Sequence, residues 1–316
     1  MARRFAGFFC VAMGGFLYRG GMKPFFLILS ACFAVALSAQ AAHPFLCCDY
    51  QGNKVAVVSV DGKIEWEYTC PNPQDCWRLP NKNYLICYRT GACEITADKK
   101  IVWEYKAPEK VEVHSCQPLA NGNVLVAEGG TCRIIEVDRA GKIVKELKIP
   151  AAAQSTHEQI RGARKTADGH YLLALKGEHK VAELDSDGKT VREIKIAGDT
   201  HEVVPLRDGH LLITCGDGHK VIELDGSEKV VWELNENDLP NNPLRLAGGC
   251  QRLPNGNTIV CNYLGHGFIG KQSQFFEVTR DKKIVWEFHD DQQFKTINQV
   301  QLLDVAGDET KGEINR

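Results

Sequence analysis

The sequence predicts an all-β protein built from six similar four-stranded sheets, and three observations lead to this fold class. Phrases such as "DGKIEWEY" and "DKKIVWEY" return about every 35 to 50 residues, and a period of this size indicates a solenoid or a propeller. Each repeat holds four short runs rich in Val, Ile, Leu and Trp, which are typical of half-buried strands. No segment after residue 43 has helical periodicity. We therefore predict a six-bladed β-propeller.

The strands of each repeat are separated by recognisable turns. An Asn-Gly or Asp-Gly pair follows the first strand, and such pairs favour the positive φ angles of a two-residue hairpin turn. A glycine-containing loop follows the second strand, and Asp-Gly-Lys or a variant follows the third. Complete four-strand repeats are predicted at 74–105, 113–148, 156–195, 198–234 and 247–288.

The two ends of the repeat region are expected to share one blade. Residues 45–68 supply only three strands, whereas "INQVQLLDV" at 297–305 supplies a single strand that resembles a first strand. Pairing of this strand with the N-terminal sheet would complete the sixth blade and close the ring. The propeller is therefore assigned to residues 43–305, and residues 306–316 to a polar tail.

Residues 1–42 differ from the rest of the chain and are predicted to be a secretory signal peptide. They contain four basic and no acidic residues, and an apolar stretch that ends in Ala39-Gln40-Ala41, as such signals do. A membrane-anchored helix is the competing interpretation. "LSAC", ending at Cys32, also resembles a lipoprotein cleavage box. We expect a periplasmic or secreted protein, with peripheral membrane association only if Cys32 is lipidated.

The charge of the mature chain excludes one class of partner. Loss of the four basic residues in 1–42 changes the net charge from −2 to −6. An acidic chain without basic clusters is unsuited to nucleic acid, so no nucleic-acid partner is expected. Thirteen cysteines are present, eleven of them after residue 42.

Most cysteines and the repeated tryptophans have a structural explanation. Cys76, Cys116 and Cys250 each lie three residues before the Leu that precedes the first turn. Recurrence at equivalent places predicts small apolar side chains packed between neighbouring sheets. Cys70 and Cys76 could alternatively form a disulfide. Trp residues recur in the fourth strands, where outer-strand packing is expected. No CxxC, phosphate loop, GxSxG or HExxH motif is present.

Histidines gather on one predicted face of the propeller. Antiparallel strands place the entries to first strands and the loops after second strands on the same face, and the Asp-Gly turns on the opposite face. His170 and His210 follow such turns, whereas the remaining blade histidines and His289 fall on the first face. The blade histidines of that face are His114, His157, His179, His201, His219 and His266.

Alignment of the repeats identifies the side chains at the channel mouth. In each complete repeat, the inner position lies five residues before the residue that precedes the first turn. The closing strand has an equivalent position, so each blade contributes one inner residue. These positions, with His157 as an alternative to Arg161, are Gln74, His114, Arg161, His201, Gly248 and Asn298.

Three interpretations of this ring are open. The residues form a polar, water-filled channel, or imidazoles from three blades bind a metal ion with water as a fourth ligand. In the third, the ring handles an anion. Histidine can act as a nucleophile or proton carrier near neutral pH. Arg161 offers a fork of donors for sulfate, phosphate or carboxylate. The sequence identifies no cofactor.

Two phrases carry a resemblance to known propellers. "DGKIEWEY" resembles the repeat of pyrroloquinoline-quinone-type propellers, and "HSCQPLANGNVLVAE" is similar to the inner strand of arylsulfotransferase-like six-bladed propellers. The second resemblance implies a histidine that carries a sulfuryl group, with His201 or His114 as the nucleophile. It also implies that Arg161 steadies the charge of the transferring group.

The functional prediction is an exported binding or scaffold propeller. Its channel face, with Gln74, His157, His179, His219, His266 and Asn298 as ligand-binding residues, would meet a small molecule, a glycan or a partner protein. The alternative is an arylsulfotransferase-like enzyme that uses His114, His201 and Arg161. A third possibility is a structural member of an outer-membrane assembly machine.

Overall fold

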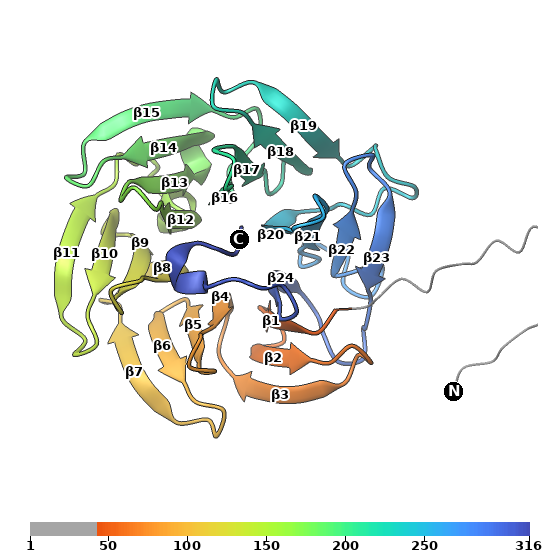
Figure 1. Cartoon of the computed structure of the whole chain (residues 1–316), viewed down its shortest axis with the longest axis horizontal. Helices are drawn as coiled ribbons and strands as arrows, with labels where there is room; N and C mark the ends of the chain where they lie inside the picture. The colour runs from red at the N-terminus through yellow and green to blue at the C-terminus, as the bar shows by residue number, and fades with distance from the viewer. Residues whose placement is uncertain (1–42) are drawn as a thin grey trace, which may run out of the picture. The chain divides into compact units, whose positions relative to one another are not determined.

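The computed structural model describes residues 43–316 and forms a ring of six four-stranded antiparallel sheets. Figure 1 shows the sheets arranged radially around a common centre, with the first strand of each repeat nearest that centre. This confirms the six-bladed β-propeller. The signal peptide and the Cys32 lipidation site predicted within residues 1–42 lie outside the described residues. Among the described residues, no helix is long and apolar enough to span a membrane.

The first three blades hold the strands from the N-terminal half of the chain, together with the closing strand. Blade 1 consists of β24 (Ile297–Leu302), β1 (Phe45–Asp49), β2 (Lys54–Val58) and β3 (Ile64–Thr69). Blade 2 consists of β4 (Pro73–Arg78), β5 (Tyr84–Tyr88), β6 (Gly91–Ile95) and β7 (Ile101–Lys106). Blade 3 consists of β8 (Glu112–Pro118), β9 (Val124–Gly129), β10 (Arg133–Val137) and β11 (Ile143–Lys148).

The other three blades follow in chain order. Blade 4 consists of β12 (Gly162–Lys165), β13 (Tyr171–Leu175), β14 (Lys180–Leu184) and β15 (Thr190–Lys195). Blade 5 consists of β16 (Glu202–Pro205), β17 (Leu211–Thr214), β18 (Lys220–Leu224) and β19 (Val230–Asn235). Blade 6 consists of β20 (Ala247–Arg252), β21 (Thr258–Asn262), β22 (Phe275–Val278) and β23 (Ile284–Phe288). The helical turns are α1 (Thr156–Gln159), η1 (Lys176–Glu178) and η2 (Glu309–Lys311).

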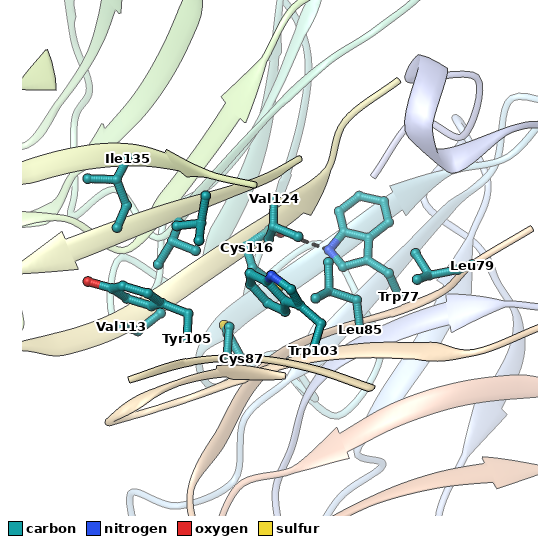
Figure 2. Packing of buried hydrophobic residues seen from close by; sticks show 13 residues of the cluster. Trp77, Leu79, Leu85, Cys87, Trp103, Tyr105, Val113, Cys116, Val124 and Ile135 are labelled. Atoms are coloured by element: carbon teal, nitrogen blue, oxygen red, sulfur yellow. Dashed lines mark hydrogen bonds between the residues drawn. The ribbon is translucent and has the colours of Figure 1, made fainter. Parts of the chain in front are cut away.

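Burial along the strands follows from face-to-face packing of the blades. The inner strands β1 and β9 are buried at every position, because each of their faces meets a neighbouring sheet. The outer strands β3 and β11 alternate between half-buried and exposed residues, because only one of their faces packs inward. Apolar clusters fill the spaces between the sheets, and Figure 2 shows the cluster between blades 2 and 3.

The first turn in each of blades 2 to 6 differs in type from the predicted two-residue turn. In blade 3 the Gly122 amide donates to the Leu119 carbonyl (2.9 Å), and Gly122 has a φ of +85°. Asn121, its partner in the Asn-Gly pair, does not have a positive φ. The loop is thus a turn closed by one left-handed residue, a three-residue hairpin connection in which only the glycine needs positive φ. Lys82 takes that conformation in blade 2, with a φ of +67°.

The cysteines and tryptophans pack as the repeat predicts. All eleven described cysteines are free thiols, so Cys70 and Cys76 do not form a disulfide. Ten of the eleven are buried. Three of the outer-strand tryptophans also link neighbouring blades, because each indole nitrogen donates to a carbonyl in the last turn of the next blade. These bonds are Trp66 to Ala97 (2.9 Å), Trp103 to Asp138 (2.8 Å) and Trp232 to Arg280 (2.9 Å).

Ring closure depends on the pairing of β24 with β1, in the register Phe45 with Leu302 through Asp49 with Ile297. Asp49 is fully buried at the end of this pair. Its carboxylate accepts from the backbone amides of Lys295 (3.0 Å) and Thr296 (2.8 Å), and from that of Gly52 (3.1 Å). One side chain therefore joins the N-terminal strand to the entry of the closing strand.

Replacement of Asp49 by alanine should destabilise the closed ring. Asp49→Ala leaves three backbone amides without their acceptor, and we expect a loss of about 2–4 kcal/mol in the free energy of unfolding. Urea unfolding measures this loss. Asp61→Ala, at an exposed position, is the matched control and should change the stability by less than about 0.5 kcal/mol. Equal effects of the two substitutions would contradict the role of Asp49.

Candidate functional site

Four side chains from three blades converge at one mouth of the channel, around Arg161. Arg161 directly precedes β12, His114 lies on β8, His201 directly precedes β16, and His157 lies on α1. The Arg161 Nη1 atom lies 2.8 Å from His114 Nδ1 and 3.3 Å from His157 Nε2. The Nη2 atom lies 3.1 Å from His201 Nε2. The structure thus brings together four of the residues that the sequence placed at the mouth.

The hydrogen-bond donors of Arg161 determine the protonation of the three histidines. A guanidinium group has donors only, so His114 Nδ1, His157 Nε2 and His201 Nε2 must be unprotonated acceptors. Burial and then the charge of Arg161 lower the pKa of His114 to about 3. The same two causes lower the pKa of His157, and they lower that of His201 far below its usual range. All three imidazoles are therefore neutral at pH 7.

Glu112, which sequence reasoning missed, completes the cluster on the side away from Arg161. Its Oε2 atom lies 3.2 Å from His114 Nε2 and 3.2 Å from His157 Nδ1. These are the ring nitrogens that must carry the protons, because the other two accept from Arg161. The contact with His114 is the largest cause that holds the pKa of Glu112 well below its usual range. Two neutral imidazoles thus separate a carboxylate from a guanidinium.

The cluster carries a net positive charge when Arg89 is included. Arg89 forms an ion pair with Glu112, so two guanidinium groups stand against one carboxylate. The Arg161 guanidinium itself has only neutral imidazoles as hydrogen-bonding partners in the described part of the chain, and its buried Nε atom has none. A cation without a direct carboxylate partner can accept an anion.

Two tyrosines lie on the same face of the ring as Arg161. Tyr50 directly follows β1 and Tyr263 directly follows β21, in loops after the second strands of their blades. Their rings meet edge to face with centroids 6.0 Å apart, and the Tyr263 hydroxyl accepts from Gln51 Nε2 at 3.4 Å. This face of the ring therefore holds aromatic rings with hydroxyl groups in addition to the guanidinium.

The other predicted ligand-binding residues lie apart from Arg161. Asn298 Nδ2 donates to the Gln74 carbonyl at 2.9 Å. His179 bonds to the carbonyl of Gly198 (2.9 Å). His219 pairs with Glu236 (2.9 Å) and His266 with Asp217 (3.0 Å) in the loops after second strands. These three histidines form separate contacts on the same side of the ring.

The geometry bears on the two chemical interpretations of the histidines. A metal ion bound by the imidazoles of three blades would need the nitrogen lone pairs of these histidines. In this structure those lone pairs accept hydrogen bonds from Arg161. Glu112, His114 and His157 also present ligand atoms within 4.8 Å of one another, but the ring nitrogens that face Glu112 are the protonated ones. His114 Nδ1 faces Arg161, and its buried Nε2 atom lies 3.2 Å from Glu112 without a hydrogen bond. His201 has one nitrogen, Nδ1, that Arg161 does not use.

Comparison with known proteins identifies a family and a set of similar folds. A family model described as Mal s 1 allergenic protein-like matches residues 57–280. A protein of unknown function from Bacteroides caccae is 28% identical, with a TM-score of 0.76 over 82% of this chain and 98% of that chain. No curated protein matches the sequence.

Two lyase structures share the fold at lower identity. A streptogramin B lyase is 13% identical, with a TM-score of 0.58 over 84% of this chain and 95% of that chain. A catalytically inactive virginiamycin B lyase from Staphylococcus aureus, bound to quinupristin, is 18% identical, with a TM-score of 0.53 over 78% of this chain and 77% of that chain. At these identities the likeness concerns the fold alone. The resemblance to quinone-type and arylsulfotransferase-like propellers stays a prediction.

The low pKa of His114 predicts a specific pH dependence of stability. Between pH 6.5, the ordinary value, and the folded value of about 3, the unfolded chain binds more protons than the folded chain. The stabilisation is therefore complete above pH 6.5 and is lost as the pH falls towards 3. Urea unfolding should show a slope of at most about 1.4 kcal/mol per pH unit from this imidazole.

Substitution of His114 tests the assignment. His114→Asn should reduce the slope between pH 6 and 4, and the lowered pKa values of His157 and His201 account for the slope that remains. His170 and His210 have raised pKa values through hydrogen bonds to Glu183 and Glu223, so their contribution has the opposite sign and is lost as the pH rises. Identical slopes for His114→Asn and the wild type would show that His114 is not held neutral.

Proposed function

The chain belongs to the Mal s 1 allergenic protein-like family, and from the geometry of its channel mouth we propose that it binds a small anionic ligand through Arg161. The observation that carries this proposal is a guanidinium group whose hydrogen-bonding partners are three neutral imidazoles. The ligand class is a carboxylate, sulfate or phosphate, whose oxygens match the fork of guanidinium donors.

The surroundings of Arg161 support this role. Arg161 is held in place from three blades, so little conformational entropy is lost when a ligand binds. The neutral histidines position the guanidinium and leave its charge intact. A carboxylate in the same place would neutralise that charge. Tyr50 and Tyr263 add aromatic surface and hydroxyl groups on the same face of the ring, which favours an anion that carries an apolar or aromatic group.

Export of the protein is part of the proposal. The basic and apolar character of residues 1–42 supports a periplasmic or secreted protein that meets its ligand outside the cytoplasm. The lyase activity of the structural neighbours is not transferred, because a shared fold does not imply a shared function.

Loss of the Arg161 charge should weaken anion binding. We expect Arg161→Gln to raise the Kd for benzoate, phenyl sulfate or phenyl phosphate about 10- to 100-fold, because a charge-assisted hydrogen bond contributes about 1.5–3 kcal/mol. Isothermal titration calorimetry at pH 7 measures the change. Lys142→Gln, on an exposed outer turn, removes the same charge and should leave Kd unchanged.

A turnover assay with phenyl sulfate separates binding from catalysis. Release of phenol from phenyl sulfate by the wild type, lost in His201→Ala, would favour the group-transfer enzyme over the binding protein. Equal Kd values for the wild type and Arg161→Gln with all three anions would contradict the proposed function.

A further inference from the structure

A second charged cluster lies inside the channel, and the anion site does not use it. It contains Asp75 on β4, Arg164 on β12, Glu202 on β16 and Arg316 from the segment after β24. All four residues are buried, and no more than 3% of any of these side chains is exposed. A charge buried away from water destabilises the fold unless an opposite charge lies close to it. Loss of any one contact in this cluster should therefore lower the free energy of unfolding markedly.

Arg316 makes three contacts that are typical of a bound guanidinium group. Its Nη2 atom donates to Asp75 Oδ1 at 2.9 Å, and its Nε atom donates to the Val300 carbonyl at 3.0 Å. The guanidinium carbon lies 4.3 Å from the centroid of the Trp77 ring. The indole is itself held by a hydrogen bond from its nitrogen to the Cys116 carbonyl (2.8 Å), drawn in Figure 2.

The two carboxylates of the cluster depend on Arg316 to different degrees. Glu202 pairs with Arg164 and also accepts from Gln299 Nε2 (2.9 Å) and from the Cys250 amide (3.3 Å). Asp75 accepts from the Cys76 amide (2.9 Å), and its Oδ2 atom lies 3.3 Å from Arg164 without a hydrogen bond. Without Arg316, one guanidinium would face two carboxylates, and Asp75 would lose its closest cation.

Arg316 reaches this place through a segment that crosses the channel. Figure 1 shows the segment after β24 entering the ring and ending at its centre. Hydrogen bonds hold it to three blades: from the Arg252 amide to the Asn315 carbonyl (2.9 Å), from Arg207 Nη2 to the Glu313 carbonyl (2.7 Å) and from Gln301 Nε2 to Glu309 (2.9 Å). A cavity of about 850 Å³ runs beside the segment and is lined by Trp77, Arg164 and Arg316.

We propose that the interior of the channel is a binding site for a guanidinium group, and that Arg316 occupies this site in cis. Asp75, the Val300 carbonyl and the Trp77 ring form the receptor. The ligand class is a guanidinium-bearing small molecule or an arginine side chain of a peptide, which would bind when residues 306–316 leave the channel. The adjoining cavity gives the incoming group a path to Trp77.

The receptor should discriminate between cations. A guanidinium is planar, presents several donors in one plane and stacks on an aromatic ring, whereas an ammonium group is a compact and strongly hydrated charge. Asp75 and Val300 use two different donors of the same group. Methylguanidinium should therefore bind to the emptied site, and methylammonium should not.

Chemical rescue of Arg316→Ala in the full-length chain tests the proposal. The substitution empties the receptor, and the melting temperature should fall below that of the wild type. Methylguanidinium at ~20 mM should then raise the melting temperature of the variant by about 2–4 °C relative to methylammonium at the same concentration. The wild type, whose site is occupied, should show no difference between the two cations.

Two further measurements keep the test decisive. Asp75→Asn in the Arg316→Ala background should abolish the difference between the cations, because the carboxylate is lost. If Arg316→Ala does not fold from its expression host, its refolding yield from urea is compared with each cation present, and methylguanidinium alone should increase it. Equal effects of the two cations on melting temperature or refolding yield would overturn the proposal, and so would a guanidinium-specific shift in the wild type as large as that in the variant.

Discussion

The pairing of β24 with β1 holds the six sheets in a ring, and both sites in the channel depend on it. A repeat cannot bury both faces of its inner strands alone, so each blade is stabilised by its two neighbours. The joint is made of a five-residue β1 and a six-residue β24, with the buried carboxylate of Asp49 accepting from backbone amides on both sides of it. Opening of this joint would separate the inner strands that carry the channel residues.

The channel holds two clusters whose electrostatics differ. At the mouth, neutral imidazoles surround Arg161, and the nearest carboxylate, Glu112, is separated from it by the rings of His114 and His157. In the interior, Arg164 and Arg316 pair directly with Asp75 and Glu202. Strand β12 joins the clusters, because Arg161 precedes it and Arg164 lies within it. A short strand thus places one guanidinium among neutral imidazoles at the mouth and another among carboxylates in the interior.

The repeat pattern also explains why equivalent positions diverge in role. Cys76, Cys116 and Cys250 share one place in their blades and pack between sheets as small apolar side chains. By contrast, Gln74, His114, Arg161 and His201 share the inner position but have different contacts. Gln74 contributes a carbonyl to Asn298, whereas the other three meet around one guanidinium. The scaffold places a side chain from each blade at the channel, and the residue type decides the chemistry.

The sequence alone determined the architecture of this protein, because strand periodicity and turn residues are local and recur in every blade. The same recurrence located His114, Arg161 and His201 at the channel mouth, since equivalent residues of a ring face one axis. Only the tertiary structure decided the partners. Glu112 lies two residues before the inner position and carries no repeat signal, yet it meets His157 from the next blade. Residues 306–316 resemble an ordinary polar tail, and the burial of Arg316 depends on Asp75 and Trp77, more than 200 positions away in the sequence. Such contacts arise from long-range packing in the closed ring, which no local pattern encodes.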